Sequence, residues 1–196
     1  MSATARDFMP WSADGGQKID VQWFSLGASS NPYGGEPCYV TSGNVLKVSG
    51  SAPAIVAFGG IAAAPFGYKK NGTTVTRNPR TGTNFAQYDM CPVWIARPGS
   101  RFVTPNFYVS GTATTPTRAH IGVTVSIVLV SSTYGVDTVA TTAALRVWDV
   151  LDKNRKSVQD PTSDGYTAAT ASASKGVYVI VEVVQSQWVV NTALTS

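Results

Sequence analysis

The chain has few charged residues, and this shortage limits the fold classes open to it. Asp, Glu, Lys and Arg make up 13% of its 196 residues, against about 25% in an average globular protein. Glutamate occurs only twice, as Glu36 and Glu182. Helices that face water usually carry more Glu, Lys and Arg, whereas the abundant Val and Thr favour strands and the Gly and Ser favour turns. The composition predicts an all-β fold.

Histidine and cysteine are also scarce, which restricts the chemistry open to the chain. The one histidine, His120, is not accompanied by a GxSxG elbow that would present a serine nucleophile. Cys38 and Cys91 lie far apart in the sequence and lack the CxxC spacing typical of metal sites. We therefore expect a histidine that makes ordinary hydrogen bonds at a strand end, and two core thiols that form no disulfide.

Two pairs of aspartates are the remaining candidates for catalysis. Asp149 with Asp152, and Asp160 with Asp164, could supply the two carboxylates of a glycosidase. The first pair lies next to basic residues, which indicates charge pairing at the surface. The second stands in "DPTSDG", a turn signal without the alternating acidic positions of an EF-hand loop. The sequence thus predicts no enzymatic activity, no cofactor and no metal site.

Long apolar runs are missing too. The most apolar stretch, residues 175–190, is shorter than the roughly 20 residues that a membrane-spanning helix needs, and it carries Glu182 at its centre. Apolar residues alternate within it at period two, which predicts a strand in the middle of a sandwich or barrel, or at an interface. The first 17 residues hold no apolar signal-peptide core, so we expect no export by the usual route.

Shorter strand patterns and turn signals fill the rest of the chain. They predict about nine or ten strands and a single β domain over residues 18–196, folded as a jelly-roll or barrel-like β-sandwich. Residues 155–174 are expected to form an exposed loop on the rim of the sheet. The individual predictions are a strand over 18–26, two strands about an "SGN" turn within 38–50, a bend or close approach at Gly59 and Gly60, a small hairpin at Asn71 and Gly72, two strands joined by the turn "RPGS", a strand over 119–130, a turn near Tyr134 and Gly135, and an alternating strand over 145–152.

Residues 1–17 have no period of their own and are predicted to form an extended N-terminal arm. The arm mixes small polar residues with three large apolar ones, Phe8, Met9 and Trp11. Such a segment gains stability only by lying on its own domain or on a neighbour. We take these three residues as candidate contacts with a neighbouring subunit.

The basic residues are dispersed. The formal net charge is +4, and there is no run of about five or six like charges of the kind that binds nucleic acid on its own. We therefore expect no direct nucleic-acid partner. The five tryptophans stand in different strands or in the arm, which indicates core and interface packing.

The order of several segments is similar to that of a known family. The stretches run "GNVLKVSGSAPAIVAFGGIAAAPFGYKK", "CPVWIARPGSRFV", "IGVTVSIVLVSSTYGVDT", "LRVWDVLDKN" and "GVYVIVEVVQSQWV". Over residues 37–190 this order resembles the capsid decoration, or cement, proteins of tailed bacteriophages. The resemblance rests on apolar and glycine positions. It has no counterpart for the N-terminal arm, and the basic excursion at 67–90 is longer than usual.

The resemblance implies a structural virion protein that is made in the host cytoplasm and does not associate with a membrane. Its expected form is a jelly-roll or barrel-like domain on the outer surface of an icosahedral head, a homodimer or homotrimer that bridges subunits of the major capsid protein. Many modest contacts repeated by symmetry would stabilise the shell. On this view Arg77, Arg80 and Arg101 are candidate contacts with an acidic capsid surface. One alternative is the major coat protein of a small icosahedral virus, which usually has a strongly basic arm; here residues 1–17 contain only Arg6 among basic residues. Another is a fibre or receptor-binding head module whose loops hold carbohydrate.

Overall fold

Strands dominate the computed structural model, which describes residues 8–11, 19–27, 32–48, 58–63, 68–70, 73–75, 89–139, 144–167, 174–186 and 188. These residues contain fifteen strands and the short 3₁₀ helix η4 (Arg118–His120). The predicted all-β, barrel-like fold is confirmed, although the strands outnumber the nine or ten expected. In the described part of the chain, no helix has the length and apolar character required to cross a bilayer.

One layer of the molecule is a small barrel that closes on itself. Strand β2 pairs in parallel with β4 and antiparallel with β8, and the ring is completed by antiparallel pairing of β4 with β3, β3 with β5, and β5 with β8. Closure gives each strand a partner on both sides. The five strands are β2 (Val21–Leu26), β3 (Pro37–Thr41), β4 (Asn44–Lys47), β5 (Gly60–Ala62) and β8 (Met90–Ile95).

A hairpin extends the barrel wall. Strands β6 (Tyr68–Lys70) and β7 (Thr73–Val75) pair antiparallel, and β6 continues onto β8 at Met90. The predicted turn residues Asn71 and Gly72 lie outside the described residues, but the two strands that flank them confirm the hairpin.

Two glycine positions help to shape the barrel. β3 and β4 meet at Ser42 and Gly43, whose φ angles of 49° and 77° form the tight turn predicted from "SGN". At Gly60, an added Cβ would lie 2.3 Å from the carbonyl oxygen of Trp94. Only glycine lets β5 and β8 approach this closely, which is the role expected for the glycine pair.

The barrel interior is filled by small and medium apolar side chains. Along β8, Cys91, Val93 and Ile95 belong to the interior cluster, whereas Trp94 between them belongs to the core outside the barrel. This is the period-two alternation of a strand with two buried faces. The full interior set is Leu26, Cys38, Val45, Ala62, Cys91, Val93 and Ile95.

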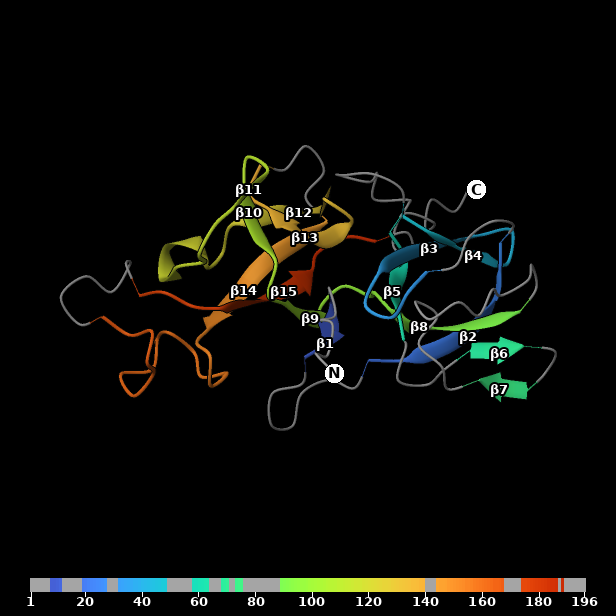
Figure 1. Cartoon of the computed structure of the whole chain (residues 1–196), viewed down its shortest axis with the longest axis horizontal. Helices are drawn as coiled ribbons and strands as arrows, with labels where there is room; N and C mark the ends of the chain where they lie inside the picture. Colours follow the sequence, from blue (N-terminus) through green and yellow to red (C-terminus); the bar gives the residue numbers. More distant parts are fainter. Residues whose placement is uncertain are drawn as a thin grey trace, which may run out of the picture.

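The second layer is an open sheet of eight strands, which lies beside the barrel along the long axis of the molecule (Figure 1). Its order is β1-β9-β15-β14-β12-β13-β10-β11, and all neighbours pair antiparallel except β13 and β10. The strands are β1 (Met9–Pro10), β9 (Arg101–Thr104), β10 (Phe107–Val109), β11 (Thr112–Ala113), β12 (Thr124–Val130), β13 (Thr133–Asp137), β14 (Leu145–Leu151) and β15 (Tyr178–Val183).

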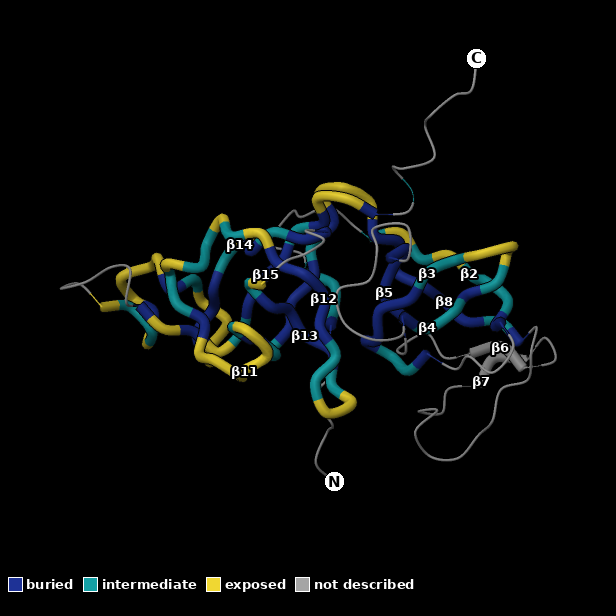
Figure 2. Tube along the Cα trace, turned by 90° about the horizontal axis from the view of Figure 1, so that it is seen from above, coloured by how far each residue is buried: buried dark blue, intermediate teal, exposed yellow. Residues whose placement is uncertain are grey.

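The main hydrophobic core lies between the sheet and the barrel. The inner face of the sheet, meaning the face toward the barrel, contributes Phe102, Val147 and Val181, and the barrel contributes Ile61 and Trp94. Figure 2 shows buried chain on both sides of this junction, in β5 and in β12 and β13. The two layers therefore share one core.

Polar groups also join the two layers. The Tyr134 hydroxyl, from β13, donates a hydrogen bond to the carbonyl oxygen of Val48. The Lys47 ammonium lies 5.6 and 5.5 Å from the ring centroids of Tyr33 and Tyr134 and forms a 2.9 Å ion pair with buried Glu36. A buried carboxylate needs such a partner. The contacts of Lys47 with Glu36 and Tyr134 therefore hold the end of β4 against the sheet.

The apolar run at 175–190 does not form one strand. β15 covers its first half, in the central position that the period-two pattern predicted. Farther along, Trp188 lies on the barrel, where its ring is stacked 6.2 Å from Phe24 and its indole N–H donates to the Gly59 carbonyl oxygen at 2.5 Å. The run therefore links the sheet to the barrel.

The strand predicted over 119–130 begins later than expected. Residues 118–120 form η4, and Gly122 turns the chain with a φ of 88°, so β12 starts at Thr124. The apolar pattern alone extends through this segment, and the glycine between Ile121 and Val123 is what interrupts it.

The turn predicted near Tyr134 and Gly135 is present but lies earlier in the chain. The chain turns between β12 and β13 at Ser131 and Ser132, whose φ angles are 48° and 69°. Serine adopts this left-handed region only uncommonly, so the nearby glycine gave a stronger but misleading turn signal. Gly135 instead lies within β13, where an added Cβ would be 2.5 Å from the Asn106 carbonyl oxygen.

The "RPGS" turn is present but does not form a hairpin. Gly99 has a φ of 85°, and the Ser100 amide donates to the Arg97 carbonyl oxygen at 2.9 Å. The strands on its two sides, β8 and β9, belong to different layers. The turn therefore carries the chain from the barrel to the sheet.

The alternation predicted over 145–152 holds only in part. The pairing of β14 with β15 shifts register between Val147 and Asp149, which leaves Trp148 without a partner in the ladder. Such a β-bulge adds one residue and exchanges the two faces beyond it. Val150 consequently joins the main core, and Leu151 joins a separate cluster on the opposite face.

Candidate interaction surface

The outer face of the eight-stranded sheet points away from the main core. Along β15, Val181 belongs to that core, so Ile180 and Glu182 lie on the outer face. Arg101 on β9 and Arg146 on β14 stand directly opposite Glu182. The outer face therefore carries a row of three charged residues across three adjacent strands.

Both arginines share the single carboxylate. Arg146 Nη2 donates to Glu182 Oε1 at 2.7 Å, and Arg101 Nε donates to Oε2 at 3.1 Å. The Glu182 side chain is 12% exposed, whereas the arginine side chains are 32% and 44% exposed. Opposite charges placed directly across strands stabilise a sheet. Two positive charges face one negative charge, so one positive charge remains uncompensated within the row.

Trp148 lies over this row. It is the extra residue of the β14 bulge and is 41% exposed. Its ring centroid is 3.5 Å from Cζ of Arg101, two strands away, and 5.9 Å from Cζ of Arg146. A guanidinium stacked on an indole is the best cation–π geometry. We refer to Arg101, Arg146, Trp148 and Glu182 as the outer-face cluster.

An apolar patch continues the outer face beside the cluster. Its buried members are Val103, Leu151 and Ile180, with Met9, Trp11 and Tyr178 packed against them. Strand β1 pairs with β9 and thereby places the arm residues on this patch. The guanidinium of Arg155 lies 5.8 Å from the Tyr178 ring, which adds a second cation–aromatic contact to the face.

The structure assigns the arm residues to the chain's own fold. Phe8 is 1% exposed in the main core, and its amide donates to the Gly35 carbonyl oxygen at 3.1 Å. Met9 and Trp11 are half-buried, and the Trp11 amide donates to the Arg101 carbonyl oxygen at 2.9 Å. Of the two supports considered for the arm, residues 8–11 use their own domain. A partner could reach Met9 and Trp11, but Phe8 only if β1 left the sheet.

The structure describes only one of the three arginines predicted to contact a partner. Arg101 belongs to the outer-face cluster. Arg77 and Arg80 lie outside the described residues, so their predicted contacts stay predictions.

The loop after β14 is organised by one buried carboxylate. Asp152 is 2% exposed and accepts hydrogen bonds from the amides of Asn154, Lys156 and Asp164 and from the Ser163 hydroxyl, at 2.8 to 2.9 Å. Burial by itself would raise the pKa of Asp152, but these four donors outweigh it and lower the pKa below its ordinary value. In Figure 1 this loop extends from the end of the molecule away from the barrel.

The other aspartates considered for catalysis also have structural partners. Asp149 accepts hydrogen bonds from the Val150 amide and the Ser157 hydroxyl at 2.8 and 3.0 Å. Asp160 accepts two from Thr162, whose amide and hydroxyl lower its pKa. Among the described residues, no three His, Cys, Asp or Glu side chains are grouped so that they could hold a metal ion.

His120 stands at the end of η4 and makes local hydrogen bonds. Its Nδ1 accepts a hydrogen bond from the Thr117 amide at 2.9 Å, and its ring packs edge-on to Phe107 with centroids 4.7 Å apart. The predicted hydrogen-bonding role is confirmed, although it lies on a 3₁₀ turn before the strand.

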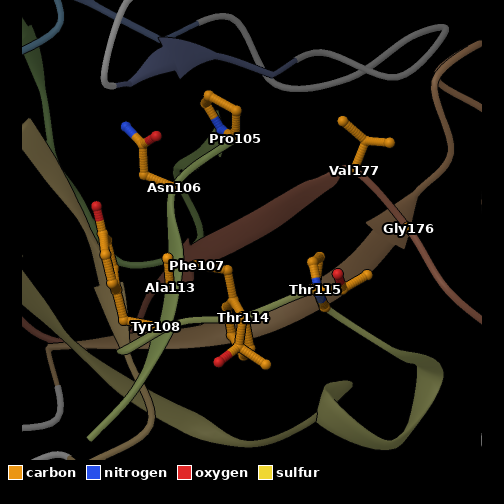
Figure 3. Close-up of a pocket in the computed structure, with 10 residues that line it drawn as sticks. Pro105, Asn106, Phe107, Tyr108, Ala113, Thr114, Thr115, Gly176 and Val177 are labelled. Carbon is orange, nitrogen blue, oxygen red and sulfur yellow. The ribbon is translucent and has the colours of Figure 1, made fainter. Parts of the chain in front are cut away.

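A groove of about 400 Å³ lies close to Phe107 (Figure 3). It is lined by residues 105–108 and 113–116 together with Gly176 and Val177. These lining residues include the Tyr108 phenol but no carboxylate, imidazole, ammonium or thiol. The groove thus offers a surface for binding and no acid–base pair.

The two cysteines are buried thiols in the barrel and are not joined by a disulfide, as predicted. Burial, followed by the charges of Cys91 and Glu36, raises the pKa of the Cys38 thiol well above its ordinary value. A protonated, buried thiol is a poor nucleophile, so its position favours packing.

Of the outer-face cluster, only Arg101 is a contact residue predicted from the sequence. Trp148 is predicted there only as a core or interface residue, and Glu182 serves only to exclude a membrane span. The signal available was the presence of isolated charges in three largely apolar strands, Arg101 in β9, Arg146 and Asp149 in β14, and Glu182 in β15. Only the strand order brings these positions together.

Comparisons of the chain with protein-family models, with curated proteins and with solved structures found no match.

Proposed function

We propose that the chain is a structural virion protein that binds the outside of an icosahedral phage head and stabilises the lattice of the major capsid protein. The order of segments over residues 37–190 supports this, because it resembles that of capsid decoration proteins. The proposal gives the chain a phage head as its location, the major capsid protein as its partner, and a homodimer or homotrimer as its form.

The observation that carries the proposal is an exposed cluster of arginines and a tryptophan on the outer face of the sheet. The inner face is buried on the barrel, whereas the outer face presents Trp148 at 41% exposure above two arginines. Tryptophan and arginine are enriched among the residues that dominate protein–protein binding. A sheet that projects such a cluster suits a protein whose work is to bind a large surface.

The direct test is binding to expanded heads of the phage that encodes the chain, prepared without it. Purified protein should co-sediment with these heads at a saturating ratio set by the capsid lattice, and should raise the temperature at which they rupture. Absence of co-sedimentation at micromolar concentrations would overturn the proposal.

The mass in solution provides a second check. Light scattering coupled to size exclusion should give a dimer or trimer of the 20.6 kDa chain. Spontaneous assembly into megadalton particles would instead identify a coat protein that builds a shell by itself.

A further inference from the structure

We propose that the outer-face cluster is a docking site for a carboxylate-bearing loop of a partner protein, whose Asp or Glu takes up guanidinium donors that Glu182 leaves unused. This inference rests on the proposed function, since it names the chemistry of the surface that the chain meets on the capsid.

The cluster has hydrogen-bond donors to spare. A guanidinium carries five N–H donors. In the part of the chain that the structure describes, the side chains of Arg101 and Arg146 each spend one nitrogen on Glu182. Both remain partly exposed, at 32% and 44%. Because a carboxylate accepts two parallel hydrogen bonds from one guanidinium, a second carboxylate can bind beside Glu182.

Trp148 prepares the site for such a ligand. The indole holds the Arg101 guanidinium at 3.5 Å, which restricts the arginine before binding and reduces the entropy lost on binding. The exposed part of the indole offers apolar surface to the methylene groups of an Asp or Glu side chain. The site therefore has both the charged and the apolar contacts that an acidic side chain needs.

The charge balance favours a protein carboxylate over nucleic acid. Nucleic-acid binding draws its affinity from neutralising several phosphates at once. The cluster has only one positive charge beyond its own ion pairs. The nearby Asp149 and Arg155 on this face have opposite signs and cancel. One surplus charge beside an aromatic ring suits one acidic side chain.

The first experiment titrates the isotope-labelled full chain with N-acetyl hexaglutamate amide and follows the Trp148 indole N–H resonance, assigned with the variant Trp148→Phe. We expect a saturable shift whose dissociation constant rises with salt, and no shift with hexalysine. No saturable shift, or tighter binding of a 12-base-pair DNA duplex than of hexaglutamate, would overturn the proposal.

Two substitutions predict effects of opposite sign. Arg101→Gln removes one guanidinium and should weaken hexaglutamate binding about tenfold, the effect of losing one charge-assisted contact. Glu182→Gln removes the internal competitor and should tighten binding several-fold. Arg101→Lys keeps the charge but not the planar fork, so its affinity should lie between wild type and Arg101→Gln. Equal affinities, or changes of the same sign in Arg101→Gln and Glu182→Gln, would contradict the site.

The matched control is Arg97→Gln. Arg97 is also ion-paired, with Asp20 at 3.5 Å, but on the turn between the layers, so its loss changes the net charge equally and should leave binding unaltered. A thermal unfolding curve for each variant shows that it is folded.

The same variants, added to expanded heads, separate the two proposals. If wild type and Arg101→Gln bind heads equally, the docking site fails and the proposed function stands. If hexaglutamate binds to the cluster but heads do not bind the chain, the proposed function fails and the carboxylate site stands.

Discussion

The barrel and the open sheet are both built from short apolar strands, but they differ in which of their faces are covered. The barrel closes its strands into a ring, fills its inside with small apolar side chains and thiols, and covers part of its outside with the sheet. One face of the sheet packs in the shared core. The other face points outward and carries arginines and a tryptophan. The barrel therefore supports the sheet from its inner side, while Trp148 and the two arginines on the outer face remain partly exposed.

The largest expected effect contrasts the two faces of the sheet. Phe102→Ala on the inner face removes a 1% exposed ring from the shared core and should lower the free energy of unfolding by about 3–5 kcal/mol. Trp148→Ala on the outer face should cost less than about 1 kcal/mol, because it loses chiefly a partly exposed cation–π contact. Urea unfolding measures both. A Trp148→Ala cost as large as that of Phe102→Ala would show that the outer face is part of the core.

A pair of glycine substitutions tests the close packing of the barrel. Gly60→Ala would place a Cβ 2.3 Å from a backbone oxygen of the adjacent strand and should destabilise the chain by about 2–3 kcal/mol. Gly43→Ala meets open space at a φ of 77° and should cost only about 1 kcal/mol. Equal costs for the two variants in denaturant unfolding would contradict the proposed tight contact between β5 and β8.

The hydrogen bonds to Asp152, in the loop after β14, should make the free energy of unfolding decrease in acid. The pKa of Asp152 is lowered in the folded chain, so its contribution to stability is present above the unfolded pKa of about 3.9 and is lost as the pH falls through the lower folded value. Asp152→Asn should reduce the free energy of unfolding by roughly 2 kcal/mol at neutral pH, since an amide cannot accept all four hydrogen bonds.

The pH profile of unfolding between about 2 and 7 tests this assignment. Below pH 4 the stability of Asp152→Asn should fall less steeply than that of wild type. The control Asp160→Asn replaces an exposed carboxylate whose partners belong to one threonine, and should follow wild type more closely. Parallel acid profiles for wild type and Asp152→Asn would exclude Asp152 as the anchor.

The smallest expected effect concerns the barrel thiols. Cys38 and Cys91 are both buried, and the raised pKa of Cys38 keeps its thiol protonated. Neither should react with a thiol reagent at pH 8 in the folded chain on the timescale of minutes, and both should react at once in denaturant. Rapid labelling of the native chain would mean that the barrel opens more easily than its closed pairing implies.

The sequence was informative for several local elements. The period-two pattern located β15, and the "SGN" turn and the Asn71–Gly72 pair located two hairpins. Long-range pairing was not accessible, because closure of the barrel depends on a parallel contact between β2 and β4 and on β2 meeting β8, which lies more than 60 residues away. The exact position of one turn could not be predicted either, because Ser131 and Ser132 adopt positive φ angles although neither is a glycine.

The candidate surface shows the same limit. Arg101, Arg146 and Glu182 are far apart in the sequence, and each stands in a largely apolar strand. Their row exists because β9, β15 and β14 are neighbours, and Trp148 covers it because of a bulge that the regular alternation concealed. Sequence could supply the residue types of the site but not their assembly.

The measurement that tests the account most directly is a cryo-electron microscopy map of expanded heads saturated with the chain. We expect the outer face of the eight-stranded sheet to lie against the major capsid protein, with Trp148 buried and an acidic side chain beside Arg101. The β6–β7 side of the barrel should point away from the shell. A bound chain whose Trp148 remains in solvent and whose barrel makes the contact would contradict it.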